Sequence, residues 1–209
     1  MIDNITFNFV KETVKSYQDE KRFAHTEGVA NEAYALGMIY MPSFADRLRL
    51  AGYLHDITKC FSQERQLALC EEYGIEVNLD KLTPKLLHAR TGCEFARRLF
   101  GKEIVDDEIY SAIIHHTTGI AGMSLFDTII YIADYIEANR TFEDCVKLRK
   151  YFYDNIESAQ NGEEKKEVLR KTVVLSFNYT IEDLIREDKR IDSDTIDARN
   201  YFLSVKKCF

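Results

Sequence analysis

The chain has 209 residues, of which 45% are hydrophobic and 30% charged, a composition typical of a globular protein rather than a disordered or fibrous one. This length is at the upper end of a single domain and does not require two domains. The net charge of −7 argues against general nucleic-acid binding, because a phosphate backbone needs a basic surface. We therefore expect no nucleic-acid partner.

The sequence shows no sign of export or of a membrane span. The first 20 residues are amphipathic and acidic, unlike the basic and then apolar layout of a signal peptide. No apolar run approaches the roughly 18 residues that are needed to span a bilayer. The five cysteines are odd in number and lack C-x-x-C spacing, which indicates reduced thiols. We expect a cytoplasmic protein.

Apolar residues recur at helical spacing almost throughout the chain, and no convincing alternating strand is present. The chain has only two prolines, so long helices can run without interruption. We predict helices over residues 4–18, 24–41, 44–57, 62–74, 84–99, 105–117, 124–139, 143–156, 163–186 and 194–206. The predicted fold is all-α, with one domain over residues 1–209. Its core covers about residues 20–140, and the C-terminal helices of residues 143–206 pack on it.

Several of these helices carry signals at their ends. Ser43 with Asp46, and Ser124 with Asp127, have the spacing of an N-terminal cap and the first helical turn. Gly74 falls where a helix should stop, since glycine readily takes the left-handed conformation that ends many helices. These signals set the predicted boundaries to within a few residues.

The pair His55-Asp56 follows directly on an apolar helical stretch, and Lys59 lies one turn later. Adjacent helical residues point about 100° apart, so both can reach one metal ion only near a helix end or from the interior of a bundle. The alternative is a solvated dipeptide at the end of a helix, since a short motif of this kind often occurs by chance.

Asp134 lies within the strongly apolar segment IIYIADYIEANR. A buried carboxylate in such a helix needs a metal ion, a cationic side chain or hydrogen bonds. Two interpretations of Asp134 therefore stay open, namely a metal ligand and a carboxylate bonded to a neighbouring backbone group or to Arg140.

The other histidines also lie in apolar helical stretches or at their ends: His25, His88, His115 and His116. Each is more simply explained alone, for example by the favourable position of a histidine pair at a helix C-terminus. Taken together with the two aspartates, however, they form a set of imidazoles and carboxylates on different helices. This donor set suits iron, manganese or zinc, and a bridging aspartate can hold two such ions.

The order of these residues also matches a known family. His25, then His55-Asp56, then Asp134 gives the H…HD…D pattern of the HD phosphohydrolase superfamily. The segments RFAHTEGV, AGYLHDITK, LLHARTG, HTTGIAGMSLFDTIIYIADYIEANR and TIDARNYFL resemble its YqeK-type branch. Members of that branch are bacterial bis(5′-nucleosyl)-tetraphosphatases that cleave diadenosine tetraphosphate symmetrically into two ADP. The resemblance covers roughly residues 20–205.

The resemblance implies an HD-domain helical bundle with a metal site in its core. The first ion would be held by the residues of the pattern: His25, His55, Asp56 and Asp134. Asp56 would bridge to a second ion, which His88 and His116 approach. His115 falls where this family often has tyrosine, and its part as a further ligand is left open. The expected cofactor is a di-iron centre, with manganese, cobalt, nickel, magnesium and zinc as alternatives.

The resemblance further implies that the phosphates of the substrate are met by basic, imidazole and hydroxyl side chains: Arg22, Lys59, His88, His116, Thr117, Thr118 and Arg140. The hypothesis is that a metal-bound hydroxide attacks a central phosphorus, with Asp56, His55 and Lys59 as the catalytic residues. Alternatives are a broader HD nucleotidase acting on dNTPs, nucleoside monophosphates or guanosine tetraphosphate, and a non-catalytic nucleotide sensor. A homodimer is left open.

Overall fold

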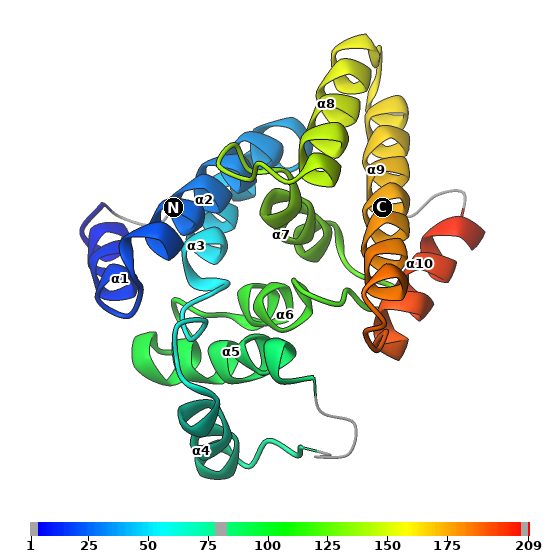
Figure 1. The fold of residues 1–209 in the computed structure, drawn as a ribbon. Coiled ribbons are helices and arrows are strands. Elements are labelled where there is room, and N and C mark those ends of the chain that lie inside the picture. Colours follow the sequence, from blue (N-terminus) through cyan, green and yellow to red (C-terminus); the bar gives the residue numbers. More distant parts are fainter. Residues whose placement is uncertain (1–3, 78–82, 206–208) are drawn as a thin grey trace.

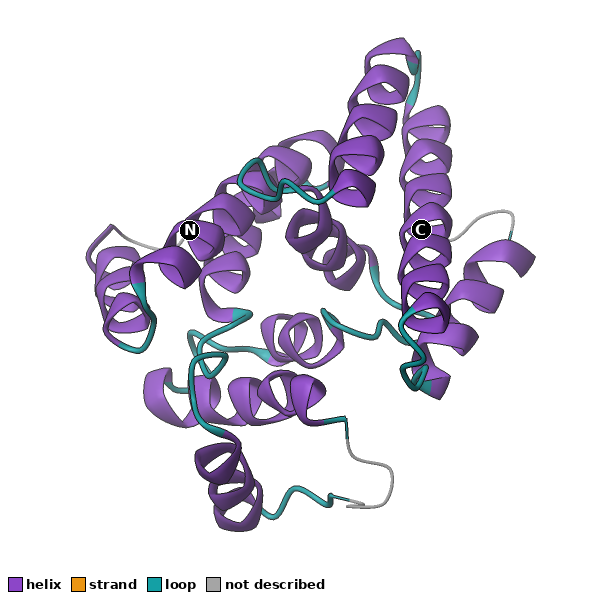
Figure 2. Cartoon of the chain, viewed as in Figure 1, coloured by secondary structure: helices purple, strands orange, loops and turns teal. Residues whose placement is uncertain are grey.

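The computed structural model describes residues 4–77, 83–205 and 209, and these residues form helices and loops without a strand (Figure 2). The all-α prediction is therefore confirmed. The helices are α1 (Asn4–Ser16), α2 (Glu20–Tyr40), α3 (Ala45–Leu54), α4 (Gln63–Tyr73), α5 (Leu87–Phe100), α6 (Asp107–His115), α7 (Leu125–Ile136), α8 (Glu143–Ser158), α9 (Gly162–Arg186) and α10 (Ser193–Ser204). Two short 3-10 helices, η1 (Pro42–Phe44) and η3 (Pro84–Leu86), precede α3 and α5.

Three helix boundaries differ from the prediction in ways that matter for the centre of the molecule. Helix α2 begins at residue 20 instead of 24, because the Asp19 side chain caps it by accepting a hydrogen bond from the backbone N–H of Arg22 at 2.7 Å. Helix α3 ends at residue 54 instead of 57, so His55 and Asp56 lie in the turns that follow it. Helix α7 ends at residue 136 instead of 139, since Glu137 has an extended backbone with ψ of 151°.

Two of the predicted helix-end signals are present in the structure, and one is absent. Ser124 and Asp127 form a reciprocal capping box at the start of α7, as their spacing predicted. The predicted cap by Ser43 is wrong: Phe44 precedes α3 and gives no side-chain cap, because a 3-10 turn leads directly into the helix. Gly74 ends α4 in the left-handed conformation, with φ of 68°. The predicted end of the last helix at residue 206 lies outside the described residues.

The helices surround a shared centre (Figure 1). Helix α2 packs along α3 and α7, α6 packs between α5 and α7, and the α8–α9 hairpin joins α7 to α10. One cluster of buried apolar side chains runs from Val10 in α1 to Phe202 in α10. This continuity favours the single domain over residues 1–209, which stays a prediction.

Two glycines allow close approaches that bring the segments around the centre together. A Cβ on Gly52 of α3 would lie 2.7 Å from Cα of Ala30, so the backbones of α2 and α3 touch there. Gly119, with φ of 66°, follows α6, and a Cβ there would lie 2.6 Å from the ring of Phe177 and 3.2 Å from Ala198. The C-terminal helices α9 and α10 therefore pack directly on the turn that follows α6.

None of the described helices is long and apolar enough to cross a membrane. The described cysteines are all free thiols: Cys60, Cys70, Cys93 and Cys145. Cys208 lies outside the described residues. The cytoplasmic location and the homodimer stay predictions.

The contact between α2 and α3 gives a stability prediction. Gly52→Ala should lower the free energy of unfolding by about 1–3 kcal/mol, because its methyl group overlaps the Ala30 backbone. Gly162→Ala is the matched control, since a Cβ there meets no atom within 4 Å. The measurement is urea unfolding followed by circular dichroism, with a chelator present because a bound metal adds stability. Equal stabilities of the two variants would contradict the close contact.

Candidate metal centre

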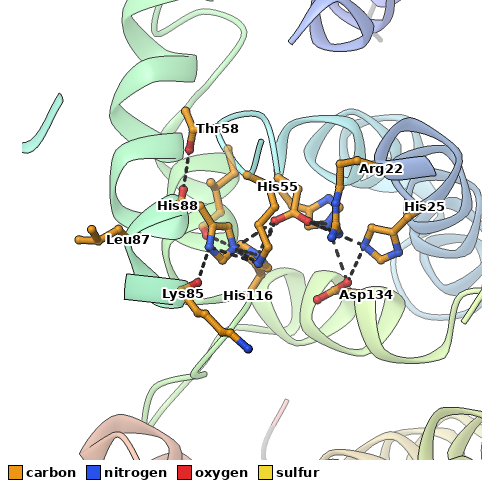
Figure 3. Close-up of polar contacts among 12 residues, drawn as sticks. Arg22, His25, His55, Thr58, Lys85, Leu87, His88, His116 and Asp134 are labelled. Carbon is orange, nitrogen blue, oxygen red and sulfur yellow. Dashed lines mark hydrogen bonds and ion pairs between the residues drawn. The ribbon is translucent and has the colours of Figure 1, made fainter. Parts of the chain in front are cut away.

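Five segments that are far apart in the sequence meet at one place (Figure 3). Helix α2 carries His25, and the turns after α3 carry His55 and Asp56. His88 is the second residue of α5, His116 directly follows α6, and Asp134 lies in α7. The structure thus brings together all four residues of the H…HD…D pattern and the two histidines expected beside a second ion.

Asp56 lies at the middle of this arrangement and is only 2% exposed. One carboxylate oxygen, Oδ1, lies 3.0 Å from Nε2 of His88 and 3.4 Å from Nε2 of His116. The other, Oδ2, lies 2.8 Å from Nη1 of Arg22, 3.5 Å from Nε2 of His55 and 3.9 Å from Nε2 of His25. The two oxygens therefore face two different groups of imidazoles, as a bridging carboxylate does.

Asp134 closes one side of the centre. Its Oδ1 lies 3.0 Å from Nε2 of His25, 3.8 Å from Nε2 of His55 and 2.6 Å from Nη2 of Arg140. The ion pair with Arg140, one of the two interpretations of Asp134, is therefore present. It does not replace the other interpretation, because the same carboxylate also faces two imidazoles.

Three of the imidazoles are oriented by the same kind of hydrogen bond to the backbone: His55, His88 and His116. The Nδ1 atom of each donates to the backbone carbonyl three residues earlier, at 2.7 Å: Gly52, Lys85 and Ile113. Gly52 and Ile113 lie in the last turns of α3 and α6, where carbonyls lack helical N–H partners and are free to accept, and Lys85 lies in the 3-10 turn η3 just before α5. A proton on Nδ1 leaves the Nε2 lone pair directed at the centre, which is how histidine binds a metal. The ring orientation is thus fixed by local backbone contacts.

Burial and charge set the protonation of these groups. Burial opposes a charge on Asp56 and on Asp134, but neighbouring imidazoles hold the pKa of Asp56 well below its usual range, and the Arg140 guanidinium together with two imidazoles does the same for the pKa of Asp134. Burial lowers the pKa of His55, and it lowers the pKa of His88 to about 4. Burial also disfavours a charged His25, but its hydrogen bonds to two carboxylates raise its pKa to about 9. A metal ion that binds His25 has to displace that proton.

The unsatisfied atoms fit a divalent metal ion. Nε2 of His55 and Oδ1 of Asp56 are buried and have no hydrogen-bond partner among the described residues. Nε2 of His88 and Nε2 of His116 face each other at 3.1 Å as two lone pairs; the Lys59 ammonium lies 3.1 Å from the first of them, and a metal ion would satisfy both. Such buried acceptors are costly when left alone, and a cation satisfies them together.

Two groups of side chains bring their ligand atoms within 4.8 Å of one another, which is close enough to hold an ion. The first consists of His25, His55 and Asp134, and the second of His55, Asp56 and His116. Imidazole nitrogens with carboxylate oxygens are the donors that first-row transition metals take in proteins.

Three cations surround the centre and reach solvent: Arg22, Lys59 and Arg140, with side chains 30%, 29% and 28% exposed. The ammonium group of Lys59 lies 3.1 Å from Nε2 of His88 and 3.9 Å from Oδ1 of Asp56. These half-exposed cations lie between the buried carboxylates and the surface, where they can meet an anionic ligand.

A cavity of about 400 Å³ opens beside His88. Its lining combines apolar, amide and basic side chains: Lys59, Phe61, Gln63, Gln66, Pro84, Lys85 and His88. Phe61 is held in place by edge-to-face contacts with Tyr17 and Phe95, at ring-centroid distances of 5.8 and 5.5 Å. The sequence analysis did not identify Lys85 or Phe61, because neither lies in a motif.

Other predicted residues lie further from the centre. His115 belongs to neither group of ligand atoms in the described part of the chain, and its Nδ1 lies 3.3 Å from the hydroxyl of Ser111. Thr117 and Thr118 are half-buried in the turn after α6, where the Thr118 hydroxyl donates to the carbonyl of Gly119. Glu137, which the sequence analysis missed, accepts a hydrogen bond from Nδ1 of His25 at 3.1 Å. Its position three residues after Asp134 is the signal that could have identified it.

Curated relatives match almost the whole length of this chain. A curated relative from Halalkalibacterium halodurans is 31% identical over 194 residues, which cover 93% of this chain and 95% of the relative. Another from Bacillus subtilis is 28% identical over 191 residues, covering 91% and 94%. Both are named symmetrical bis(5′-nucleosyl)-tetraphosphatase.

A solved structure from Clostridium acetobutylicum has the same fold, with a TM-score of 0.81 and 33% identity over 95% of this chain and 97% of that one. It is described as a predicted HD superfamily hydrolase involved in NAD metabolism. The family model described as HD domain matches residues 22–139, which include His25, the His55-Asp56 pair and Asp134. This chain therefore belongs to the HD-domain family.

Proposed function

We propose that this chain is a metal-dependent phosphohydrolase that cleaves diadenosine tetraphosphate symmetrically into two molecules of ADP. The observation that carries the proposal is the buried Asp56 carboxylate, whose two oxygens face separate groups of imidazole Nε2 atoms. The names of the relatives from Halalkalibacterium halodurans and Bacillus subtilis support this substrate and this point of cleavage.

In this proposal the residues of the H…HD…D pattern would hold the first ion: His25, His55, Asp56 and Asp134. His88 and His116, together with Asp56, would hold a second ion, while His115 is left outside. The donor set suits a di-iron centre, and manganese, cobalt, nickel, magnesium or zinc can take the same ligands. A divalent ion bound there would lower the pKa of a coordinated water and neutralise phosphate oxygens.

The side chains of the protein bind and orient the polyphosphate. Arg22 contacts the Asp56 carboxylate and Arg140 contacts the Asp134 carboxylate. Both guanidinium side chains are partly exposed to solvent on the His25 side of the centre. Lys59 and Lys85 line the cavity on the His88 side. Diadenosine tetraphosphate has two phosphates on each side of the bond that is cleaved, so basic groups on both sides of the metal centre suit it. Thr117 and Thr118 lie in the turn beside His116 and complete the proposed phosphate contacts.

The cavity beside His88 is the proposed place for one nucleoside of the substrate. Phe61 and Pro84 give it apolar surface on which a base can stack, and the Gln63 side chain can bond the edge of the base. Lys59, at the inner end of this cavity, joins it to the metal centre and acts as a catalytic residue beside His55 and Asp56 in this proposal.

The test of the reaction is product analysis with diadenosine tetraphosphate. Protein purified anaerobically, with its metal content measured, should give ADP as the sole product, and a chelator should abolish the reaction until Fe²⁺ or Mn²⁺ is added back. Separation of the products by ion-exchange chromatography gives the result. Formation of AMP and ATP would overturn the symmetrical reaction. Hydrolysis of dNTPs, nucleoside monophosphates or guanosine tetraphosphate instead would favour the broader HD nucleotidase, and no turnover of any of them would favour a nucleotide sensor.

The proposed ligand roles are tested by comparing two substitutions. Asp56→Asn should lose most of its bound metal, since its carboxylate serves both proposed ions. Its kcat should fall by more than about 100-fold, because substitution of a residue that only supports a ligand already costs about 10–100-fold. His115→Ala, as the matched control, should keep its metal content and kcat. Elemental analysis, steady-state kinetics and circular dichroism are the measurements. The role of Asp56 as a metal ligand is wrong if Asp56→Asn stays folded, keeps its metal content and keeps its kcat.

Substrate placement in the cavity gives a third prediction. Phe61→Ala should raise KM for diadenosine tetraphosphate by about 5–150-fold with little change in kcat, because base stacking on an aromatic ring contributes about 1–3 kcal/mol. Phe142→Ala is the control, since this ring is 68% exposed and outside the cavity. Thermal unfolding of both variants checks that the ring cluster around Phe61 survives. An unchanged KM in Phe61→Ala would place the nucleoside elsewhere.

A further inference from the structure

A further buried carboxylate, that of Glu137, lies just behind the metal centre. Glu137 follows the last residue of α7 and is only 1% exposed. Its Oε1 accepts from Nδ1 of His25 at 3.1 Å, and its Oε2 accepts from the backbone N–H of Asn139 at 2.7 Å. The Asn139 side chain in turn donates to the carbonyl of Ala24 on α2, at 3.0 Å. Both oxygens of Glu137 are therefore engaged, one of them on a proposed metal ligand.

The space for this carboxylate exists because residue 28 is glycine. Gly28 lies on α2, one turn after His25, and the Glu137 carboxylate lies against it. A Cβ on Gly28 would lie 2.8 Å from Cδ of Glu137 and overlap Oε2. Any larger side chain at this position has to push the carboxylate away from His25.

The backbone of Glu137 is held from another helix. Arg149 of α8 donates from Nε to the carbonyl of Ile136 at 2.5 Å, and from Nη2 to the carbonyls of Glu137 and Arg140, the latter at 2.8 Å. One guanidinium thus fixes the loop that carries both Glu137 and Arg140. Arg149 lies beyond residue 139, where the HD-domain match ends.

His25 differs from the other imidazoles of the centre in how it is oriented. The Nδ1 atoms of His55, His88 and His116 donate to carbonyls three residues earlier in the chain. The described partner of Nδ1 in His25 is a side chain 112 residues away in sequence. Its ring direction therefore depends on tertiary structure, and specifically on Glu137.

We propose that Glu137 is a positioning residue of the metal centre, which keeps Nε2 of His25 directed at the ion, and that Gly28 and Arg149 hold Glu137 in place for this task. The inference rests on the proposed metal site. A carboxylate on Nδ1 fixes the tautomer and the direction of a ligating imidazole and makes it a stronger ligand. Through Arg149, the C-terminal helices outside the HD-domain match act on the metal centre.

The experiment measures the dissociation constant for Mn²⁺ by isothermal titration calorimetry on the metal-free full-length chain. Glu137→Ala should weaken binding by about 10–100-fold, the usual effect of removing the partner of a metal-bound histidine. Glu137→Gln keeps an acceptor for Nδ1, so its affinity should be closer to that of the unchanged chain than to that of Glu137→Ala. Gly28→Ala should weaken binding in the same direction without altering any group that bonds His25.

Arg149→Met should also weaken Mn²⁺ binding, because it releases the three carbonyls of the loop. Phe152→Leu is its control, since this buried side chain packs in the core from the same helix and has no N–H group to donate to the loop carbonyls. Loss of affinity in Phe152→Leu equal to that in Arg149→Met, at matched thermal stability, would reduce the effect to general destabilisation and overturn the role of Arg149.

His25→Ala distinguishes failure of the positioning role of Glu137 from failure of the proposed metal site. If it loses Mn²⁺ affinity while Glu137→Ala and Gly28→Ala bind as tightly as the unchanged chain, the positioning role of Glu137 is wrong and the metal site stands. If His25→Ala itself binds Mn²⁺ unchanged, the proposed first ion site fails. Weakened binding in all three, with recovery in Glu137→Gln, supports the proposal.

Discussion

The burial of the Asp56 carboxylate is the constraint on which the rest of the structure depends. An ionised carboxylate removed from water is stable only if opposite charge and hydrogen bonds replace the lost hydration. Arg22 and three imidazoles from three separate segments surround Asp56, so α2, α5, α6 and the turns after α3 have to meet at this point. A cation between these groups would satisfy the lone pairs that have no hydrogen-bond partner, so the packing that buries Asp56 also creates a site that suits a metal ion.

The centre is built largely from helix ends. His55 follows α3, His116 follows α6, and His88 stands at the start of α5. Carbonyls near these ends lie close enough to accept from Nδ1, so the same backbone geometry that ends a helix also orients a ligand. Close approaches at Gly52 and Gly119 then bring these ends to the centre. Short local contacts on a rigid frame favour the precise ligand geometry that a metal site needs.

Charge is arranged in two layers around the centre. Buried carboxylates and imidazoles form the inner layer, and the half-exposed Arg22, Lys59 and Arg140 form the outer one. The inner layer attracts cations and the outer layer attracts phosphates, although the chain as a whole is acidic. The net charge of −7 therefore does not prevent these three cations from meeting an anionic group locally.

The all-α fold and the chemistry of the donors could be predicted from the amino-acid sequence, because helical periodicity and a histidine or aspartate in apolar surroundings are local properties. Which of these donors meet depends on how the helices pack. His115 and His116 are adjacent in sequence, yet packing turns only His116 to the centre, since neighbouring helical residues point about 100° apart. The early end of α7 and the missed Glu137 have the same origin. Each depends on contacts with residues far away in the chain, such as Arg149 on the carbonyls after α7, and no local pattern records such contacts.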